Sequence, residues 1–435
     1  MSRVNFFWHR RDFRIEDNHG LFRALRADEP IVPVFIFDRE ILDKLEDKDD
    51  ARVTFIHNEV QRLKAEYEAA GSTLLVAYGT PEEIWKKWLS EYSIVKVYAN
   101  GDYEPYARER DAAIARLCSE HEVSFQAYKD HVIFEMDEVV KDNGDPYVVY
   151  TPYSKVWKKQ LTGGHLSGYP SENELGGLWK TNPAELLSLA DMGFVASDLP
   201  IPSRALDEHI VEHYCETRDL PAKRGTTRMS VHLRFGTVSI RQLAKRANEL
   251  SEKYLNELIW RDFYQAIIYH FPGVVEQSFR PEYDFIQWEN NEEHFEKWCS
   301  GNTGYPIVDA GMRELNSTGF MHNRVRMIVA SFLTKHLLID WRWGEGYFAR
   351  KLLDFELASN NGGWQWAAGS GVDASPYFRV FNPELQMKKF DPKLAYVKQW
   401  VPEYQELSYK PIVDHKLARE RALTRYKEGI ERGRS

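Results

Sequence analysis

Long hydrophobic runs are missing from this 435-residue chain, and no segment approaches the roughly 20 apolar residues that a transmembrane helix needs. The N-terminus, MSRVNFFWHRRDFR, is charged from its third residue, so we expect no signal peptide. Only three cysteines are present, Cys118, Cys215 and Cys299, and they show neither paired nor metal-ligand spacing. These absences predict a protein of the reducing cytoplasm without disulfides, a membrane anchor or a metal site.

Several motifs that would define an enzyme class are also missing. There is no phosphate-binding Walker loop, no HExxH and no CxxC. The segment GSGVDA at 369–374 matches the dinucleotide pattern G-x-G-x-x-[GA], but it follows no predicted strand and opens no βαβ unit, so we reject it. This excludes one way of holding a dinucleotide and leaves others open.

Acidic residues are missing from one segment of this otherwise acidic chain. The net charge is −9, which disfavours a nucleic-acid partner. Between Asp219 and Glu249, however, only basic charges occur. They are Lys223, Arg224, Arg228, Arg234, Arg241, Lys245 and Arg246. This basic segment is either a solvated helix face or a local surface able to bind phosphate.

Apolar patterns predict the fold class. Short buried strands are expected at residues 4–10, 31–38, 72–79 and 94–102. Helical patterns alternate with them at residues 51–71, 81–92 and 103–121. This alternation predicts a doubly wound parallel sheet, a Rossmann-like α/β domain, over residues 1–130. Prolines and glycines break residues 131–205, which predicts a connector, and residues 206–435 have helical period, which predicts an all-α domain.

The segment RGTTRMS at 224–230 precedes a predicted helix, RMSVHLRF. Thr226 or Thr227 could cap that helix, and its exposed N–H groups beside Arg228 would then form an anion site. A plain capped helix is the alternative.

The segment NELIWRDFYQAIIY at 256–269 predicts a helix that carries Glu257, Trp260, Arg261 and Tyr264 on one face. A carboxylate, an indole, a guanidinium and a phenol on one stripe suit a pocket wall that stacks a base and hydrogen-bonds to it. The alternative is a partly exposed helix whose aromatic residues cover a neighbour.

The segment at 319–339, GFMHNRVRMIVASFLTKHLLI, predicts a second helix. Asn323, Arg326 and Met327 lie on one arc, with Arg324 at its edge. Polar groups on an apolar helix seek partners, because an unpaired buried polar group costs about 1–3 kcal/mol. Alternatively, these side chains extend to solvent.

Asparagine, glycine and tryptophan are concentrated in NNGGWQWAAGSG at 360–371, in a chain with 13 tryptophans. Asn and Gly are poor helix formers, so we expect DFELASNNGGW at 354–364 to end a helix. The same small residues would let a planar ligand approach the backbone closely.

In their order and near-verbatim form, these motifs resemble the photolyase/cryptochrome family, most closely the class I cyclobutane pyrimidine dimer photolyases. The resemblance runs from WHRRDFRIEDN (8–18) to FNPELQMKKFD (381–391) and is densest at 257–264, 301–345 and 358–383. It implies an N-terminal α/β antenna domain and a C-terminal helical domain. The helical domain would hold FAD folded into a U, active as FADH⁻.

The resemblance also implies roles for single residues around the flavin. The cofactor-binding residues would be Tyr214, Thr226, Thr227, Arg228, Met229, Ser230, Arg326, Asp354, Phe355, Glu356 and Asn360. Arg326 would pair with Asp354 beside the isoalloxazine, and Asn360 would sit at flavin N5. Glu356 stands where many relatives have Asp, and its backbone would keep the contact.

Three tryptophans, Trp364, Trp341 and Trp288, match the family's hopping chain, which reduces oxidised flavin in light. For each of them, core packing is the alternative.

The activity implied is light-driven repair of cyclobutane pyrimidine dimers in UV-damaged DNA, with the dimer flipped out of the duplex. Excited FADH⁻ would donate an electron to the dimer, and Glu257 would stabilise the resulting charge by hydrogen bonding. The residues implied to bind the DNA or the lesion are Glu257, Trp260, Arg261, Tyr264, Asn323, Arg324, Met327, Trp366 and Gln386. The basic segment could add phosphate contacts.

Three other functions are weighed against this one. A cryptochrome photosensor of the plant type would carry Asp at position 360 and a long C-terminal extension, and a (6-4) photolyase would show paired histidines in place of MHNRVRM. A light-independent DNA-binding module would not bleach in blue light with a reductant. We expect a monomer in the cytoplasm, associated with the nucleoid when bound to DNA.

An antenna chromophore in the α/β domain stays open. Asp102 and Glu104 in GDYEPYARERD resemble the residues of deazaflavin-binding relatives, whereas folate-binding relatives have NERARD-like residues where this chain has YARERD. Folate, deazaflavin, FMN and an empty site are the alternatives.

Overall fold

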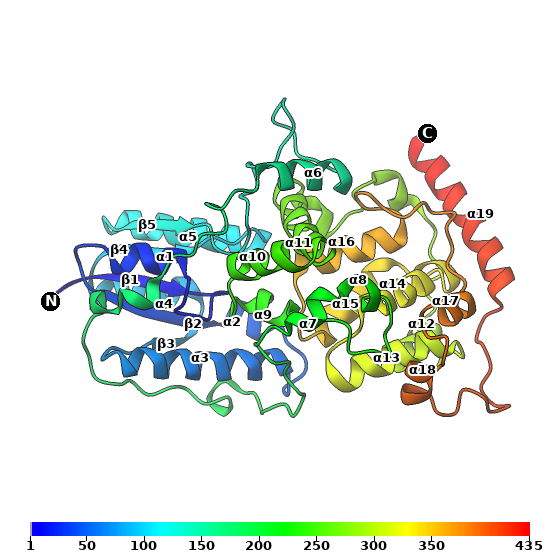
Figure 1. Ribbon diagram of the computed structural model, residues 1–435, viewed down its shortest axis with the longest axis horizontal. Helices are drawn as coiled ribbons and strands as arrows, with labels where there is room; N and C mark the ends of the chain where they lie inside the picture. The colour runs from blue at the N-terminus through cyan, green and yellow to red at the C-terminus, as the bar shows by residue number, and fades with distance from the viewer. Residues whose placement is uncertain (1) are drawn as a thin grey trace. The chain divides into compact units, whose positions relative to one another are not determined.

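The computed structural model describes residues 2–435, which form two compact units (Figure 1). The first unit contains the described residues up to Val139, together with 157–205 and 229–249. The second contains 140–156, 206–228 and 250–435. The units do not follow the predicted segments. The predicted connector, 131–205, is divided between them, with 140–156 in the helical unit and the rest in the α/β unit, and 229–249 also packs with the α/β unit.

The first unit is built on one parallel sheet of five strands in the order β3-β2-β1-β4-β5 (Figure 1). The strands are β1 (Arg3–His9), β2 (Ile31–Asp38), β3 (Leu75–Gly79), β4 (Ser93–Asn100) and β5 (Ser124–Tyr128). The predicted parallel sheet is confirmed. Strand β5 had no predicted counterpart, because it is an edge strand with largely exposed side chains and lacks a buried apolar run.

Helices cover both faces of this sheet, since successive residues of β1 point in opposite directions. Phe6 and Trp8 pack in one buried cluster with residues of α4 (Pro81–Glu91) and α5 (Pro105–Glu120). On the other face, the His9 ring bonds to Tyr67 of α3 (Ala51–Ala69) at 2.7 Å. Helices α1 (His19–Leu25) and α2 (Arg39–Leu42) follow β1 and β2.

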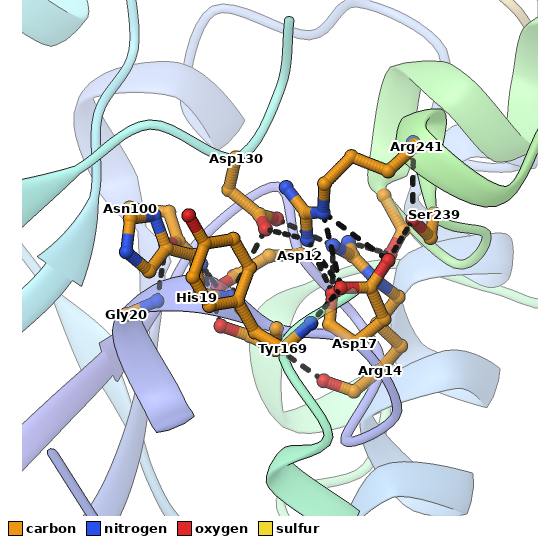
Figure 2. Close-up of polar contacts among 12 residues, drawn as sticks. Asp12, Arg14, Asp17, His19, Gly20, Asn100, Asp130, Tyr169, Ser239 and Arg241 are labelled. Atoms are coloured by element: carbon orange, nitrogen blue, oxygen red, sulfur yellow. Dashed lines mark hydrogen bonds and ion pairs between the residues drawn. The ribbon is translucent and has the colours of Figure 1, made fainter. Parts of the chain in front are cut away.

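Two helices that come later in the chain, α9 (Ser230–Phe235) and α10 (Ile240–Leu250), belong largely to this first unit. A buried ion network explains the placement of α10 (Figure 2). The Arg241 guanidinium donates to Asp17 and, at 2.8 Å, to Asp130, and Arg14 donates to the other oxygen of Asp130 at 2.6 Å. Residue 241 is thus held by two carboxylates of the sheet loops.

The second unit is helical, as predicted. Its elements include α7 (Glu208–Glu212), α8 (Tyr214–Thr217), α11 (Glu252–His270), α12 (Glu292–Ser300), α13 (Pro306–Thr318), α14 (Asn323–Ser331), α15 (Trp341–Lys351), α16 (Leu357–Ala368), α17 (Pro383–Phe390), α18 (Ala395–Trp400) and α19 (His415–Arg434). A π-helical stretch, η6 (Phe332–His336), follows α14, and α6 (Tyr150–Gln160) contains the boundary at residue 156. The main apolar core lies among α12 to α18.

Two local predictions are wrong. Helix α9 begins at Ser230 after Met229 and has no side-chain cap, so neither Thr226 nor Thr227 caps it. The segment 360–363 does not end a helix but lies inside α16, which continues to Ala368. Tertiary contacts described below outweigh the poor helix propensity of these residues.

Candidate active site

Helix α11 carries a partly exposed stripe of Glu257, Trp260 and Tyr264, as its periodicity predicted. The indole of Trp260 stacks face to face on the Tyr150 ring, with centroids 3.7 Å apart and planes 3° from parallel. The Tyr150 hydroxyl donates to the Asn256 carbonyl at 2.9 Å, which anchors the stack to α11. One face of Trp260 is therefore supported by protein, as a platform for a stacked base would be.

Glu257 forms an ion pair with Arg218, the residue that follows α8. Burial raises the pKa of the Glu257 carboxyl, and the Arg218 guanidinium partly offsets that rise. Arg218 also lies over the Tyr214 ring, 5.4 Å from its centroid. The ion pair thus holds a carboxyl group on the helix face that carries Trp260.

Arg261 departs from the exposed stripe. It is buried, and its guanidinium donates to the Glu356 carboxylate at 2.8 Å. Glu356 also accepts from the Ser359 hydroxyl at 2.9 Å. This placement differs from the DNA contact expected of Arg261, because the side chain is engaged inside the helical unit.

Helix α14 presents the second group of predicted residues. Asn323 is exposed at its first position, and Met327 is half-buried one turn later. Arg324 donates to Asp219 at 2.8 Å and lies over the Phe390 ring, 4.4 Å from its centroid. These residues therefore lie on one helix, as predicted, and Arg324 points toward the Asp219 carboxylate.

Arg326 and Asp354 form the ion pair that the resemblance implied. The guanidinium Nη2 lies 3.1 and 2.9 Å from the two carboxylate oxygens, and Nε donates to the Met321 carbonyl at 2.7 Å. Asp354 is buried, whereas Arg326 is partly exposed. The neighbouring Phe355 packs partly buried against the core.

Asn360 is held in one orientation by Glu345. Its amide nitrogen donates to the Glu345 backbone carbonyl at 3.1 Å and to the Glu345 carboxyl oxygen at 2.8 Å. Both partners are acceptors, so they select the NH₂ end of the amide. No described residue donates to the side-chain amide oxygen of Asn360, so this oxygen can accept a hydrogen bond from a ligand. Burial raises the pKa of Glu345, and the Asn360 hydrogen bond lowers it in part.

The stripe on α11 lies directly against α16, the helix of Asn360. A Cβ on Gly362 would stand 2.3 Å from the Tyr264 ring, so only glycine allows this contact. Asn361 donates to the Val274 carbonyl at 3.0 Å, which anchors the next helical face. The glycine and the asparagines of this segment thus serve helix packing.

Trp341, Trp364 and Trp288 belong to one aromatic region. Trp341 and Trp364 are buried in the main core, and Trp288 is partly exposed at its margin. Helix α15 begins with Trp341 and, one turn later, places Gly344 against Trp364, where a Cβ would stand 2.1 Å from the ring. Trp366 is half-buried on the same helix as Trp364.

The remaining cofactor candidates lie around residue 225. Tyr214 is nearly buried against Tyr254, and the Thr227 hydroxyl bonds to the Tyr254 hydroxyl at 2.8 Å. Thr226 is half-buried and Arg228 is exposed. Met229 and Ser230 fall in the first unit. On α17, Gln386 is half-buried.

The basic segment does not form one phosphate-binding surface. Arg241 is buried in the network of Figure 2, Arg234 donates to Glu104 at 3.2 Å, and Arg246 pairs with Glu249. Exposed basic residues of the segment remain at Lys223, Arg224, Arg228 and Lys245. The segment itself contains no acidic residue because the acidic partners of its arginines lie outside it in the sequence.

The two antenna candidates are also engaged internally. Asp102 accepts from Arg11 at 3.2 Å, and Glu104 pairs with Arg11 and with Arg234 at 3.2 Å each. Burial by itself raises the pKa of Asp102, but Arg11 and neighbouring basic groups lower it overall, so the carboxylate is charged.

The backbone amides at the start of α1, where nucleotides bind in related folds, also have partners within the protein. In a doubly wound sheet, phosphates bind at the N-terminus of the helix after β1. Here that end of α1 is satisfied by side chains of the same unit. The His19 amide donates to Asp130 at 3.2 Å, the Gly20 amide to Asn100 at 2.9 Å and the Leu21 amide to Asn18 at 3.1 Å. Figure 2 shows Asp130 and Asn100 on either side of His19 and Gly20.

Four residues that the sequence did not single out support the predicted ones. Arg218 holds Glu257, Asp219 holds Arg324, Glu345 orients Asn360 and Tyr150 backs Trp260. Of these four, only Arg218 and Asp219 could have been suspected from the sequence, because their opposite charges lie close to the predicted Tyr214.

Comparisons with known proteins show the family of the chain. Residues 5–172 match the family model described as DNA photolyase, and residues 254–411 match the FAD binding domain of DNA photolyase. A deoxyribodipyrimidine photo-lyase of Synechococcus is 37% identical over 95% of this chain and 90% of its own length. The Escherichia coli deoxyribodipyrimidine photo-lyase is 35% identical over 99% of this chain and 100% of its own.

Solved structures are similar throughout. A class III photolyase from Agrobacterium tumefaciens superposes with a TM-score of 0.89 at 32% identity, covering 99% of this chain and 98% of its own. An archaeal photolyase from Sulfolobus tokodaii, solved with two FAD molecules, gives a TM-score of 0.83 at 35% identity over 98% of this chain and 100% of its own.

The chain belongs to the DNA photolyase family, and the predicted resemblance is confirmed. Among the described residues, no helix is long and apolar enough to cross a membrane.

The described residues fit FAD, the cofactor of this family. Asn360 offers an oriented acceptor, Arg326 and Asp354 form a charged pair, and no atom lies within 4 Å of the position that a Cβ on Gly363 would take. A hydrogen-bond acceptor at position 360 suits the N5–H of a reduced flavin. The helical unit therefore supplies both polar and apolar groups for an isoalloxazine.

Proposed function

We propose that this protein repairs cyclobutane pyrimidine dimers in DNA, driven by light absorbed by reduced FAD. The main support for this proposal is the contact of Tyr264 with Gly362. It brings the exposed stripe of α11, which is expected to bind the lesion, against the helix of Asn360, Trp364 and Trp366. Reduced FAD, when bound and excited, supplies an electron that opens the cyclobutane ring and then returns.

Asn360 would face flavin N5 as an acceptor, and Glu345 would keep it in that orientation. Arg326 with Asp354 would lie beside the isoalloxazine. Tyr214, Thr226 and Thr227 would contact the phosphates or ribose. Glu356 would offer its backbone, because its carboxylate is engaged by Arg261.

Trp260, backed by Tyr150, would stack on the flipped dimer, and Trp366 would form a second apolar wall. Glu257 would hydrogen-bond to the dimer and stabilise the charge that develops on it. Asn323 and Met327 would contact the bases, and Arg324 the DNA. Trp364, Trp341 and Trp288 would carry electrons that reduce oxidised flavin. The protein would act as a monomer in the cytoplasm.

The decisive test is repair of an oligonucleotide with one thymine dimer under blue light. We expect repair by the wild type in light and none in the dark. Trp260→Ala should weaken lesion binding by about 1–3 kcal/mol through lost stacking, and Glu257→Ala should lower the repair yield of the bound lesion. Glu252→Ala, on the exposed first turn of the same helix, is the matched control.

Each other function gives a separate result. Repair of a (6-4) photoproduct alone would identify the other lesion class. Flavin reduction in light without repair of either lesion would identify a photosensor. Binding of DNA by a colourless protein would identify a light-independent module and contradict the proposal.

A further inference from the structure

Asp219 and Arg324 form an ion pair between two segments that lie 105 positions apart in the sequence. Asp219 Oδ1 accepts from Arg324 Nη2 at 2.8 Å and from Nε at 3.2 Å. Asp219 is the second residue after α8, and Arg324 is the second residue of α14. The pair therefore ties the α8 segment to the start of α14.

The Arg324 guanidinium is confined by its other neighbours as well. Its plane lies over Phe390, 4.4 Å from the ring centroid, and Nη1 contacts Met327 Sδ at 3.3 Å. The side chain is 18% exposed, whereas Asp219 is 43% exposed. Arg324 is thus fixed in direction while one edge remains accessible.

The pair is charged at neutral pH. Burial raises the pKa of Asp219, but the hydrogen bond and charge of Arg324 lower it overall, and Arg218 contributes to the lowering. The neighbouring His322 is buried, which lowers its pKa to about 4, so its imidazole is uncharged at neutral pH. Glu257, the other carboxyl group nearby, is paired with Arg218.

This pairing changes what Arg324 can offer to DNA. A guanidinium has five N–H donors in a fixed fork, and Asp219 takes Nε and one hydrogen of Nη2. The paired charge contributes little to the counterion release that drives sequence-independent binding. An acceptor placed at the remaining edge, however, gains a charge-assisted hydrogen bond from an already oriented donor.

We propose that Asp219 is a positioning residue that sets the preference for damaged over undamaged DNA by neutralising and orienting Arg324. The inference rests on the proposed function, because it takes Arg324 as a DNA contact. Without the carboxylate, Arg324 is a freer cation that attracts any backbone phosphate. The lesion complex gains less from such a cation, since the guanidinium must then be ordered on binding.

The test compares Asp219→Asn with Asp43→Asn. Asp43 pairs with Arg39 at 3.0 Å on the exposed surface of the α/β unit, so the control makes the same change in net charge. Binding of the flavin-loaded protein to dimer-containing and undamaged duplexes is measured over a range of salt concentrations. For Asp219→Asn we expect the affinity ratio to fall about fivefold, the upper end for a part-exposed ion pair.

Two further readouts separate positioning from folding. For Asp219→Asn, the slope of log affinity for undamaged duplex against log salt should steepen by about one, the value for one added phosphate contact. Single-turnover repair of prebound lesion should stay unchanged. Asp219→Glu should restore the ratio, and in an Arg324→Gln background Asp219→Asn should act like Asp43→Asn.

Equal affinity ratios and salt slopes in Asp219→Asn and Asp43→Asn overturn the inference while leaving the proposed function intact. A full effect of Asp219→Asn in the Arg324→Gln background also overturns it. A wild type that binds both duplexes equally and repairs neither overturns the proposed function and the inference together.

Discussion

The Tyr264 ring occupies the space that a side chain at position 362 would need. A Cβ on Gly362 would lie 2.3 Å from Tyr264 Cδ1 and Cε1, closer than any van der Waals contact. The next residue, Gly363, has no atom within 4 Å of the corresponding position. Two adjacent glycines of one helix therefore have different physical roles.

Gly362→Ala should destabilise the protein by about 1–3 kcal/mol, because the added methyl group overpacks the contact with Tyr264. Gly363→Ala, in contrast, should stabilise the helix by about 0.5–1 kcal/mol, since alanine replaces glycine in its interior without a clash. Urea unfolding of both variants measures the difference. Equal effects of the two substitutions would contradict the packing described for α16.

Glu345→Leu should loosen the Asn360 amide, which loses its side-chain acceptor and keeps only the backbone carbonyl of residue 345. The amide can then turn its NH₂ end toward the flavin, which removes the acceptor for N5–H. We expect the photoreduced cofactor to reoxidise faster in air, as followed by flavin absorption. Glu345→Gln keeps a carbonyl acceptor and should behave nearly as the wild type. The orientation argument fails if leucine and glutamine give the same rate.

Trp341→Phe and Trp288→Phe should each slow light-driven reduction of oxidised flavin in the presence of a thiol, because a phenyl ring is much harder to oxidise than an indole. Repair by chemically reduced protein should persist, since that reaction does not need the chain. Trp85→Phe, a buried tryptophan of the α/β unit, controls for packing loss. Unchanged photoreduction in both chain variants would show that these residues only pack.

The network around Asp130 should make the α/β unit sensitive to acid. Burial by itself raises the pKa of Asp130, but Arg14 and Arg241 lower it from 3.8 to about 2. Because one pKa unit corresponds to ~1.4 kcal/mol, the lowered pKa contributes about 2 kcal/mol of stability. Because the pKa is lowered in the folded state, this stabilisation is fully present above the unfolded pKa of 3.8. It is lost as the pH falls toward 2.

Asp130→Asn should cost about 3–5 kcal/mol at pH 7, since two buried guanidinium groups lose their shared carboxylate. The gap in urea midpoint between wild type and variant should narrow below about pH 4, as the wild type itself takes up the proton. Asp43→Asn, on an exposed pair, should change stability by less than about 1 kcal/mol. A gap that is constant with pH would refute the electrostatic account.

Local sequence patterns were sufficient for four of the five strands of the sheet and for most of the helices. The strands from β1 to β4 are largely apolar runs, and the apolar residues of α3, α4 and α5 recur with helical period, so each element is visible in its own residues. Strand β5 was invisible because its side chains are largely exposed. Helix α16 was misread because asparagine and glycine are poor helix formers in isolation.

The sequence by itself determined the family, the two kinds of unit and the residue types of the site, because long motifs and periodic burial are properties of neighbouring residues. Only the tertiary structure decided which partner each polar group takes: Arg241 with Asp130, Arg261 with Glu356, Arg324 with Asp219 and Asn360 with Glu345. Charge attraction and hydrogen bonding act over a few ångströms in space, whereas most of these partners lie tens to more than a hundred residues apart.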